Sequence, residues 1–201
     1  MPFWSENFGQ SANMKDPKRN FRFKVTMGSL KDSGNGQVVW FAKTCDKPSF
    51  TIETAEHQFL NHTFYYPGAV KWQSVAMQLV DPADPDAVSF VCSLLANSGY
   101  KVPGTANDLS TMTKAQAIKA LDTVRIIQLD GAGKEIETWE LKNAFITEAK
   151  FGSLEYGSDD LTQIDLTLQY DWATCSTVNR NANAQDGDKA NQTYFKLGEA
   201  S

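Results

Sequence analysis

Apolar and polar residues alternate with a period of two along much of this chain, a pattern typical of β-strands that bury one face. The clearest run covers residues 163–172. Its apolar positions, which we expect on the buried face of a strand, are Ile164, Leu166, Leu168, Tyr170 and Trp172. The polar residues between them predict that the opposite face meets water.

Eight further segments favour strands because they alternate in the same way or are rich in β-branched and aromatic residues. They are residues 21–27, 37–43, 50–56, 59–66, 70–80, 123–129, 135–141 and 144–154. Ser33–Gly36 predicts a hairpin between the first two segments, and Asp130–Gly133 predicts one between the sixth and seventh. Pro67 and Gly68 predict a turn after the fourth.

Residues 84–98 instead follow the spacing of a helix that buries one stripe of side chains. The stripe consists of Ala87, Phe90, Val91, Leu94 and Leu95. Asp84 fits the N-cap, Pro85 the first helical position and Gly99 the C-terminal cap. Residues 113–121 predict a second, short helical turn after a loop over 100–112.

The order of these elements predicts a mainly β protein with antiparallel strands, a two-sheet β-sandwich or β-barrel with one packed α-helix. Strands and helices do not alternate along the chain, which argues against a parallel sheet. With 201 residues, the chain is long enough for one domain with a substantial core. We assign that domain to residues 20–175, between an N-terminal arm (1–19) and a polar C-terminal tail (176–201).

The overall charge argues against a protein that binds nucleic acid tightly. The chain has 19 Lys and Arg against 24 Asp and Glu, a formal net charge of −5, whereas neutralising phosphates requires a surplus of bases. Neither a membrane-spanning segment nor a secretion signal is expected from the pattern of apolar residues. The odd number of cysteines (Cys45, Cys92 and Cys175) favours a reducing compartment in which they are buried or inert.

The residues that could support catalysis or metal binding do not form a known pattern. His57 and His62 are the only histidines, and in one continuous strand their odd spacing would place them on opposite faces. Together with Cys45 they match no compact zinc motif, and the chain has no Gly-x-Ser-x-Gly nucleophile elbow. The sequence therefore predicts no catalytic residues, no cofactor, no metal site and no enzymatic activity.

The charges are unevenly distributed along the chain. Residues 1–31 contain six bases and two acids, a net +4, whereas residues 122–172 contain eleven acids and four bases, a net −7. One interpretation is a solvated acidic surface beside a basic arm. The other is head-to-tail assembly, in which the basic end of one subunit meets the acidic surface of the next.

Three segments of the C-terminal half resemble the major tail tube protein of contractile-tailed, T4-type bacteriophages: Trp139–Thr147, Phe151–Tyr156 and Gln163–Trp172. The N-terminal half has the same layout. Its matching features are the strand 21–27, the aromatic strand 38–43, Pro48–Phe50, His57–Asn61, Gly68, Trp72 and the helix opened by Asp-Pro. The resemblance covers about residues 20 to 175 and is distributed over the chain, without a catalytic motif.

The resemblance implies a two-sheet β-barrel with a flanking helix and a structural role without an enzymatic step. Six subunits would form a ring, and stacked rings would form the inner tail tube through which DNA is ejected. The implied partners are other copies of the chain, the tail sheath protein, and the baseplate and tail-terminator proteins. The implied location is the virion, after assembly in the host cytoplasm, with no membrane anchor.

An acidic or neutral lumen would suit such a conduit, because it would repel phosphate and let DNA slide. The candidate lumen or inter-subunit acids are Glu135, Glu137, Asp165 and Asp171. Two alternatives remain open. One is an inner-tube subunit of a type VI secretion or other contractile injection system, and the other is a β-barrel enzyme or binding domain for a small ligand.

Overall fold

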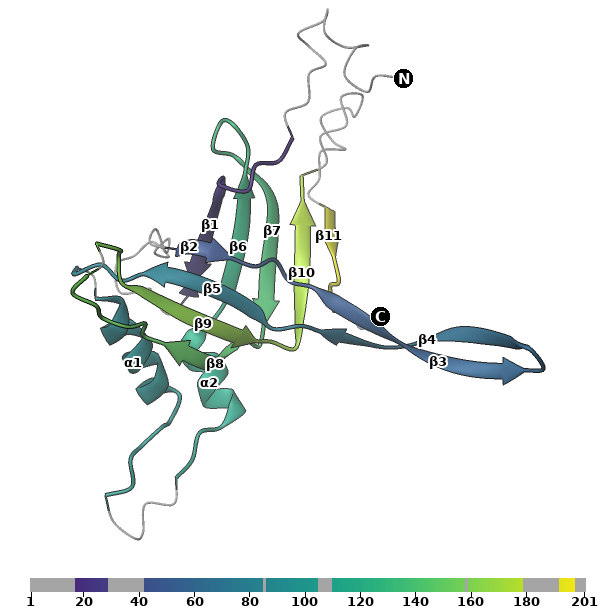
Figure 1. Cartoon of the computed structure of the whole chain (residues 1–201), viewed down its shortest axis with the longest axis horizontal. Helices are drawn as coiled ribbons and strands as arrows, with labels where there is room; N and C mark the ends of the chain where they lie inside the picture. Colours follow the sequence, from purple (N-terminus) through teal and green to yellow (C-terminus); the bar gives the residue numbers. More distant parts are fainter. Residues whose placement is uncertain are drawn as a thin grey trace, which may run out of the picture.

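The computed structural model describes residues 17–28, 42–84, 86–104, 110–157, 159–178 and 192–197. These residues form two facing antiparallel sheets, two helices and a two-stranded ribbon that projects from one end of the molecule (Figure 1). The predicted Ser33–Gly36 turn, Pro85 and most of the predicted arm lie outside the described residues.

One sheet has five strands in the order β1-β6-β7-β10-β11, and all its neighbours are antiparallel. Its strands are β1 (Phe23–Met27), β6 (Val124–Leu129), β7 (Glu135–Lys142), β10 (Trp172–Thr177) and β11 (Gln192–Tyr194). The predicted hairpin between β6 and β7 is confirmed. In its turn, the carboxylate of Asp130 accepts hydrogen bonds from the backbone N–H groups of Ala132 and Lys134, both at 2.8 Å.

The other sheet has four strands in the order β2-β5-β9-β8. They are β2 (Ala42–Cys45), β5 (Val75–Val80), β9 (Gln163–Gln169) and β8 (Phe145–Lys150). The alternation predicted for β5 and β9 is confirmed, because every second residue on these two strands is buried. These buried residues are Val75, Met77, Leu79, Ile164, Leu166 and Leu168.

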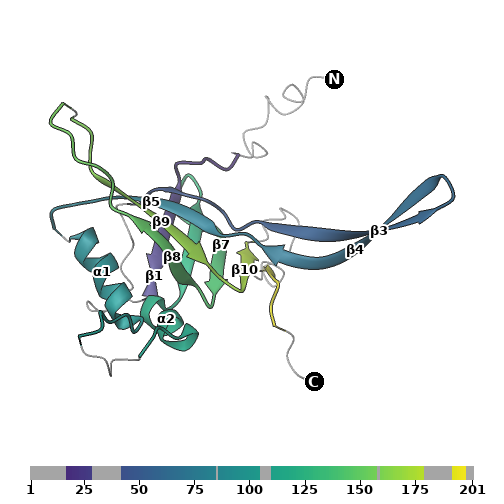
Figure 2. The same cartoon turned by 60° about the horizontal axis from the view of Figure 1, so that its bottom comes forward.

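The core lies between the two sheets, and the helices cover one side of it. Helix α1 (Ala87–Asn97) contributes Val91 and Leu94, and helix α2 (Lys114–Leu121) contributes Leu121. Both helices lie on the same side of the molecule, beside β8 (Figure 2). The predicted short helical turn at 113–121 is therefore a packed second helix.

The N-cap of α1 lies two residues after the predicted position. Asp86, and not Asp84, is the N-cap, and its carboxylate accepts hydrogen bonds from the N–H groups of Val88 (3.0 Å) and Ser89 (3.2 Å). The pattern of apolar residues could not separate two aspartates that both precede it. The predicted glycine after the helix is confirmed, since Gly99 has φ +93°.

The run 163–172 is not one strand, as the alternation predicted. The chain bends at Tyr170 and Asp171 and passes from the four-stranded sheet into the five-stranded one, so β10 begins at Trp172. Tyr170 is buried, but Trp172 is only half-buried, because the bend turns the faces of the new strand. The expected core position of Trp172 is thus wrong.

Two strand connections also differ from the predictions. Segments 21–27 and 42–45 do not pair with each other, because β1 pairs with β6 and β2 pairs with β5 in the other sheet. In the C-terminal region, β10 continues to Thr177, and Gln192–Tyr194 of the expected polar tail forms β11 beside it. Alternation predicts a strand and its buried face, but it does not specify the neighbouring strand.

The ribbon consists of β3 (Phe50–Phe59) and β4 (His62–Trp72). Its turn lies at Leu60 and Asn61, so the predicted turn at Pro67 and Gly68 is wrong. Those two residues lie inside β4, which also includes the beginning of the predicted strand 70–80. Gln73 and Ser74 separate that strand into the end of β4 and the whole of β5.

The predicted fold class is confirmed as mainly β, antiparallel and two-sheeted, with helices packed on it. The strands of the described residues form separate sheets, so they do not close into a complete barrel.

The core assignment predicts a large effect for Leu168, which is 0% exposed. Leu168→Ala is expected to lower the free energy of unfolding by about 2–5 kcal/mol, because it removes buried methyl groups and leaves a cavity. Chemical denaturation measures this difference. The matched control is Leu154→Ala at a position 89% exposed, with an expected change below about 0.5 kcal/mol. Equal losses in the two variants would contradict the assignment.

Candidate assembly surface

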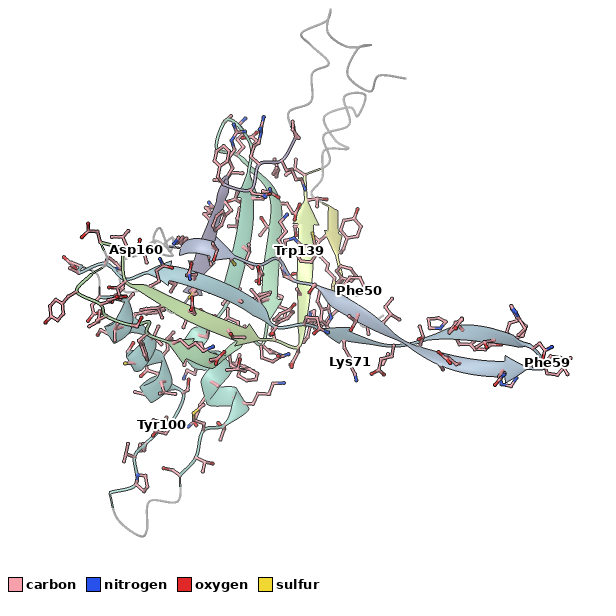
Figure 3. The ribbon with its side chains drawn as sticks, viewed as in Figure 1. Phe50, Phe59, Lys71, Tyr100, Trp139 and Asp160 are labelled. Carbon is pink, nitrogen blue, oxygen red and sulfur yellow. The ribbon has the colours of Figure 1, made fainter. Side chains whose placement is uncertain are left out.

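The ribbon β3–β4 is the most exposed element of the described chain. Figure 3 shows it extending from Phe50 at its base to Phe59 near its tip, well clear of the two sheets. Its two strands pair only with each other. The large apolar side chains that it exposes are Phe50, Ile52, Phe59, Leu60, Phe64, Tyr65, Tyr66 and Val70. A contiguous set of this kind is typical of an interaction site.

A β-bulge divides the ribbon into two halves. Ile52 is opposite Val70, but Thr54 is opposite Pro67, so one residue of β3 faces two residues of β4. Gly68 is one of these two, and a Cβ added there would lie 3.0 Å from the carbonyl oxygen of Glu53. The bulge therefore needs a residue without a side chain at this position.

The bulge moves the apolar residues from one face of the ribbon to the other. At the base they share one face, which carries Phe50, Ile52, Val70 and Trp72. Beyond the bulge most of them occupy the opposite face, which carries Ala55, His57, Phe59, His62, Phe64 and Tyr66, whereas Tyr65, opposite Glu56, stays on the face of Phe50 and Ile52. We call the set from Ala55 to Tyr66 on the opposite face the distal face. In β4 the extra residue causes the exchange, because side chains alternate with a period of two; in β3 the apolar positions themselves shift from 50 and 52 to 55 and 59.

The aromatic residues at the base of the ribbon pack within the subunit. The rings of Phe50 and Trp72 meet edge-on at 5.3 Å between centroids, and Trp72 lies 6.0 Å from Tyr170 at the bend between the sheets. Phe195, after β11, contacts Trp72 at 5.6 Å and Phe50 at 6.2 Å. This aromatic cluster attaches the ribbon to both sheets.

The distal face lies on the part of the ribbon that projects clear of the two sheets, and its aromatic rings are about half exposed (Figure 3). Phe64 is 44% and Tyr66 54% exposed. His57 and His62 both lie on this face, because the turn between them places them on paired strands. The odd-spacing argument for opposite faces is therefore wrong. Within the described ranges, no group of three His, Cys, Asp or Glu residues is placed to hold a metal ion.

Glu137 is the centre of a charge cluster that holds the connection from β2 to the ribbon. This carboxylate is 8% exposed and accepts hydrogen bonds from Lys18, from Lys47 at 2.7 Å and from the indole N–H of Trp139 at 2.6 Å. Lys47 also donates to Gln128 at 2.7 Å. The cluster joins the segment before β1, the connection from β2 to β3, and β7.

The neighbours of Glu137 strongly favour its ionised form. Burial alone would raise the pKa of this carboxyl, but the hydrogen bonds from Lys18, Lys47 and Trp139 outweigh burial and lower the pKa from 4.5 to about 2. Glu137 is thus a structural anion paired with two ammonium groups.

The other three predicted acids lie at separate places. Glu135 pairs with Lys24 at 2.7 Å, and Asp165 accepts a hydrogen bond from the amide of Gln78 at 2.9 Å. Asp171, at the bend between the sheets, accepts hydrogen bonds from Lys114 (2.7 Å) and Asn143 (2.8 Å), which lower the pKa of its carboxyl.

Part of the uneven charge is therefore neutralised inside one subunit. Lys18 and Lys24 of the basic region contact Glu137 and Glu135 of the acidic region. The structure does not gather the four predicted acids into one site, and each of them makes a contact within the chain.

The cysteines differ in environment. Burial raises the pKa of Cys45 to about 12, and burial also raises the pKa of Cys175, so both thiols stay protonated at neutral pH. Cys92 is exposed on α1, so it is not one of the buried cysteines. None of the helices in the described residues has the length and apolar character needed to span a membrane.

Comparisons with known proteins identify solved structures that have a similar fold. No protein-family model matches the sequence, and no curated protein matches it. The chain is similar to a protein in the cryo-EM structure of the anti-feeding prophage baseplate, with 20% identity over 81% of this chain and 97% of that chain and a TM-score of 0.58.

Two further structures match equally well. One is the cap that terminates the tube of the anti-feeding prophage, with 19% identity, 84% of this chain, 99% of that chain and a TM-score of 0.58. The other is a protein of the sheath-tube complex of an extracellular contractile injection system, with 18% identity over 82% of this chain and 95% of that chain and a TM-score of 0.56. The predicted resemblance to a contractile tail tube protein is confirmed at the level of the fold.

The Glu137 cluster predicts a specific dependence of stability on pH. Because its pKa is lowered on folding, Glu137 stabilises the protein fully above pH 4.5, and this contribution is lost as pH falls toward 2. The lost contribution is on the order of 3 kcal/mol. Denaturation of wild type and Glu137→Gln between pH 6 and about 2 should give curves that converge in acid. Glu135→Gln is the control, and parallel curves for wild type and Glu137→Gln would contradict the role of the cluster.

Proposed function

We propose that this protein is a structural subunit that assembles with copies of itself into stacked hexameric rings, the inner tube of a contractile tail or contractile injection machine. The observation that carries the proposal is the projecting ribbon with its uncovered distal face, on a chain with the fold found in tube-containing contractile assemblies. The role requires no enzymatic step.

The edges of the sheets support ring formation. In the described part of the chain, β2 and β8 each have a strand neighbour on one side only. Unpaired edges promote aggregation of a monomer, whereas pairing them between neighbours around a closed ring satisfies their N–H and C=O groups. Contacts between different surfaces of identical subunits are the kind that produce rings and stacks.

For the bore, we infer the outer face of the four-stranded sheet. This face is polar, with Gln78, Asp165 and Thr167 pointing away from the core. It also carries Glu148 and Lys150 of β8, so the charges that β8 and β9 place on it sum to −1 per subunit. Asp165 is the predicted acid that best fits a lumen wall, whereas Glu137 is buried beneath two lysines. A weakly negative wall would let DNA pass without adhering.

The tube could belong to a phage tail or to another contractile injection system. A phage tail tube, assembled in the host cytoplasm into the virion, agrees with the sequence resemblance, and its partners would be the sheath, baseplate and tail-terminator proteins. The similar structures named above include an extracellular contractile injection system, which favours the alternative of an injection tube. Purified parent particles distinguish the two, because a phage tail belongs to a particle that contains DNA.

The proposal predicts that the purified full chain forms rings or tubes of uniform bore at high concentration. Electron microscopy tests this directly, and sedimentation velocity measures the size of the assemblies. A reconstruction should place Asp165 on the bore and show a neutral to negative lumen. A protein that stays monomeric over the whole concentration range contradicts the proposed function, and a strongly basic lumen contradicts the assignment of the bore.

A charge placed on the distal face should impair assembly without unfolding the subunit. Phe64→Glu places a charge among aromatic residues that we expect to be buried between subunits, so the concentration needed for assembly should rise at least about tenfold. Its melting temperature should stay close to that of wild type, because Phe64 is 44% exposed in the subunit.

Thr54→Glu provides the matched control for this variant. It adds the same charge to the opposite face of the ribbon at an exposed position, and it should assemble like wild type. If Phe64→Glu also assembles like wild type, the distal face does not serve assembly.

A further inference from the structure

The tip of the ribbon carries an unusual residue. Leu60 is 81% exposed and has φ +53°, a left-handed conformation that glycine adopts far more easily than leucine. It is the first of only two residues between Phe59 and His62, which pair with each other, and tight turns favour glycine or asparagine where φ is positive. A leucine here strains the turn and leaves a large apolar side chain exposed.

Phe59 extends this apolar tip, because it is 62% exposed beside the turn. No acidic residue lies between Gln58 and Thr63, and His62 is the one ionisable group of this segment. The tip therefore presents two large apolar side chains on a flat, nearly uncharged end.

A groove of matching character lies on another part of the molecule. It is bounded by α1, α2 and β8 and has a volume of about 300 Å³. Its walls are mostly apolar and include Leu94, Leu95, Met112, Leu121, Ile146 and Phe151. Leu95, Met112 and Phe151 are each more than 40% exposed at its mouth, so the groove is open to an apolar partner.

The tip and the groove of one subunit cannot meet. Figures 1 and 2 show the ribbon projecting away from the two helices in both views, with its tip at the far end of the molecule. Glu148, the acid on the groove wall, would meet no acidic residue on an incoming tip, whose one ionisable side chain is His62. An occupant from a second copy of the chain is thus compatible in both apolar character and charge.

We propose that the ribbon tip of one subunit, with Leu60 and Phe59, inserts into the groove between α1, α2 and β8 of another subunit. This contact deepens the proposed function and rests on it, since it requires self-assembly. It joins two different surfaces of identical chains, so it propagates along a ring or stack and does not stop at a dimer. The need for an apolar side chain in the groove explains why the turn has leucine where glycine would be less strained.

The native Cys92 permits a direct test, because this exposed thiol lines the groove. In the full-length chain, Leu60→Cys places a second thiol at the tip, and a short bis-maleimide joins two thiols that lie close together. The expected result is a covalent dimer and higher multimers on denaturing gels, formed under assembly conditions. The adduct should disappear when Cys92→Ala is added to Leu60→Cys.

Leu154→Cys provides the positional control. It places a thiol on another exposed loop, at a residue 89% exposed, and should not form the adduct with Cys92. Rings or tubes that form without a Leu60→Cys adduct would overturn the docking proposal and leave self-assembly intact. A wild-type chain that never assembles would overturn both proposals.

A second measurement separates the contact from folding. Leu60→Gly removes the side chain and relieves the turn, so it should keep or raise the melting temperature while the concentration needed for assembly rises at least tenfold. Leu60→Met retains an apolar side chain and should assemble within about twofold of wild type. Assembly of Leu60→Gly at wild-type concentrations would overturn the proposal.

Discussion

Two paired strands cannot bury the side chains that they carry, because a ribbon has two faces and no second layer of its own. This constraint governs the organisation of the molecule. Eight large apolar side chains of β3, β4 and their turn are exposed. At the base, Phe50 packs against Trp72 and Phe195, whereas the side chains beyond the bulge lie on the part of the ribbon that projects clear of the two sheets (Figure 3).

The attachment of the ribbon follows from the same constraint. A projecting element can present a surface at a defined place only if its base is rigid. The aromatic cluster of Phe50, Trp72, Tyr170 and Phe195 holds the base against the bend between the sheets. Nearby, Glu137 pairs with Lys47, three residues before β3 begins. The acid predicted for a lumen instead orients the element that we expect to mediate assembly.

The structure pairs some of the charges that are unevenly distributed along the sequence. The net charge of −5 excludes tight binding of nucleic acid by a general surplus of bases, and it is compatible with a conduit. The uneven distribution along the chain suggested electrostatic contact between subunits. Part of it is satisfied internally, through the pairs Lys18–Glu137 and Lys24–Glu135. Apolar surfaces then become the stronger candidates for subunit contacts.

The sequence by itself determined the elements and their buried faces, because alternation and helical spacing are local properties that depend on residue type. It predicted the buried residues of β5 and β9, the β6–β7 hairpin, both helices and the mainly β class. Only the tertiary structure decided which strands are neighbours, where the chain changes sheets after Tyr170, and that Gly68 forms a bulge and not a turn. These outcomes depend on contacts between residues far apart in the chain, which no local pattern encodes. The position of the distal face, the pairing of Glu137 with Lys18 and Lys47, and the groove beside Cys92 all arise from such contacts.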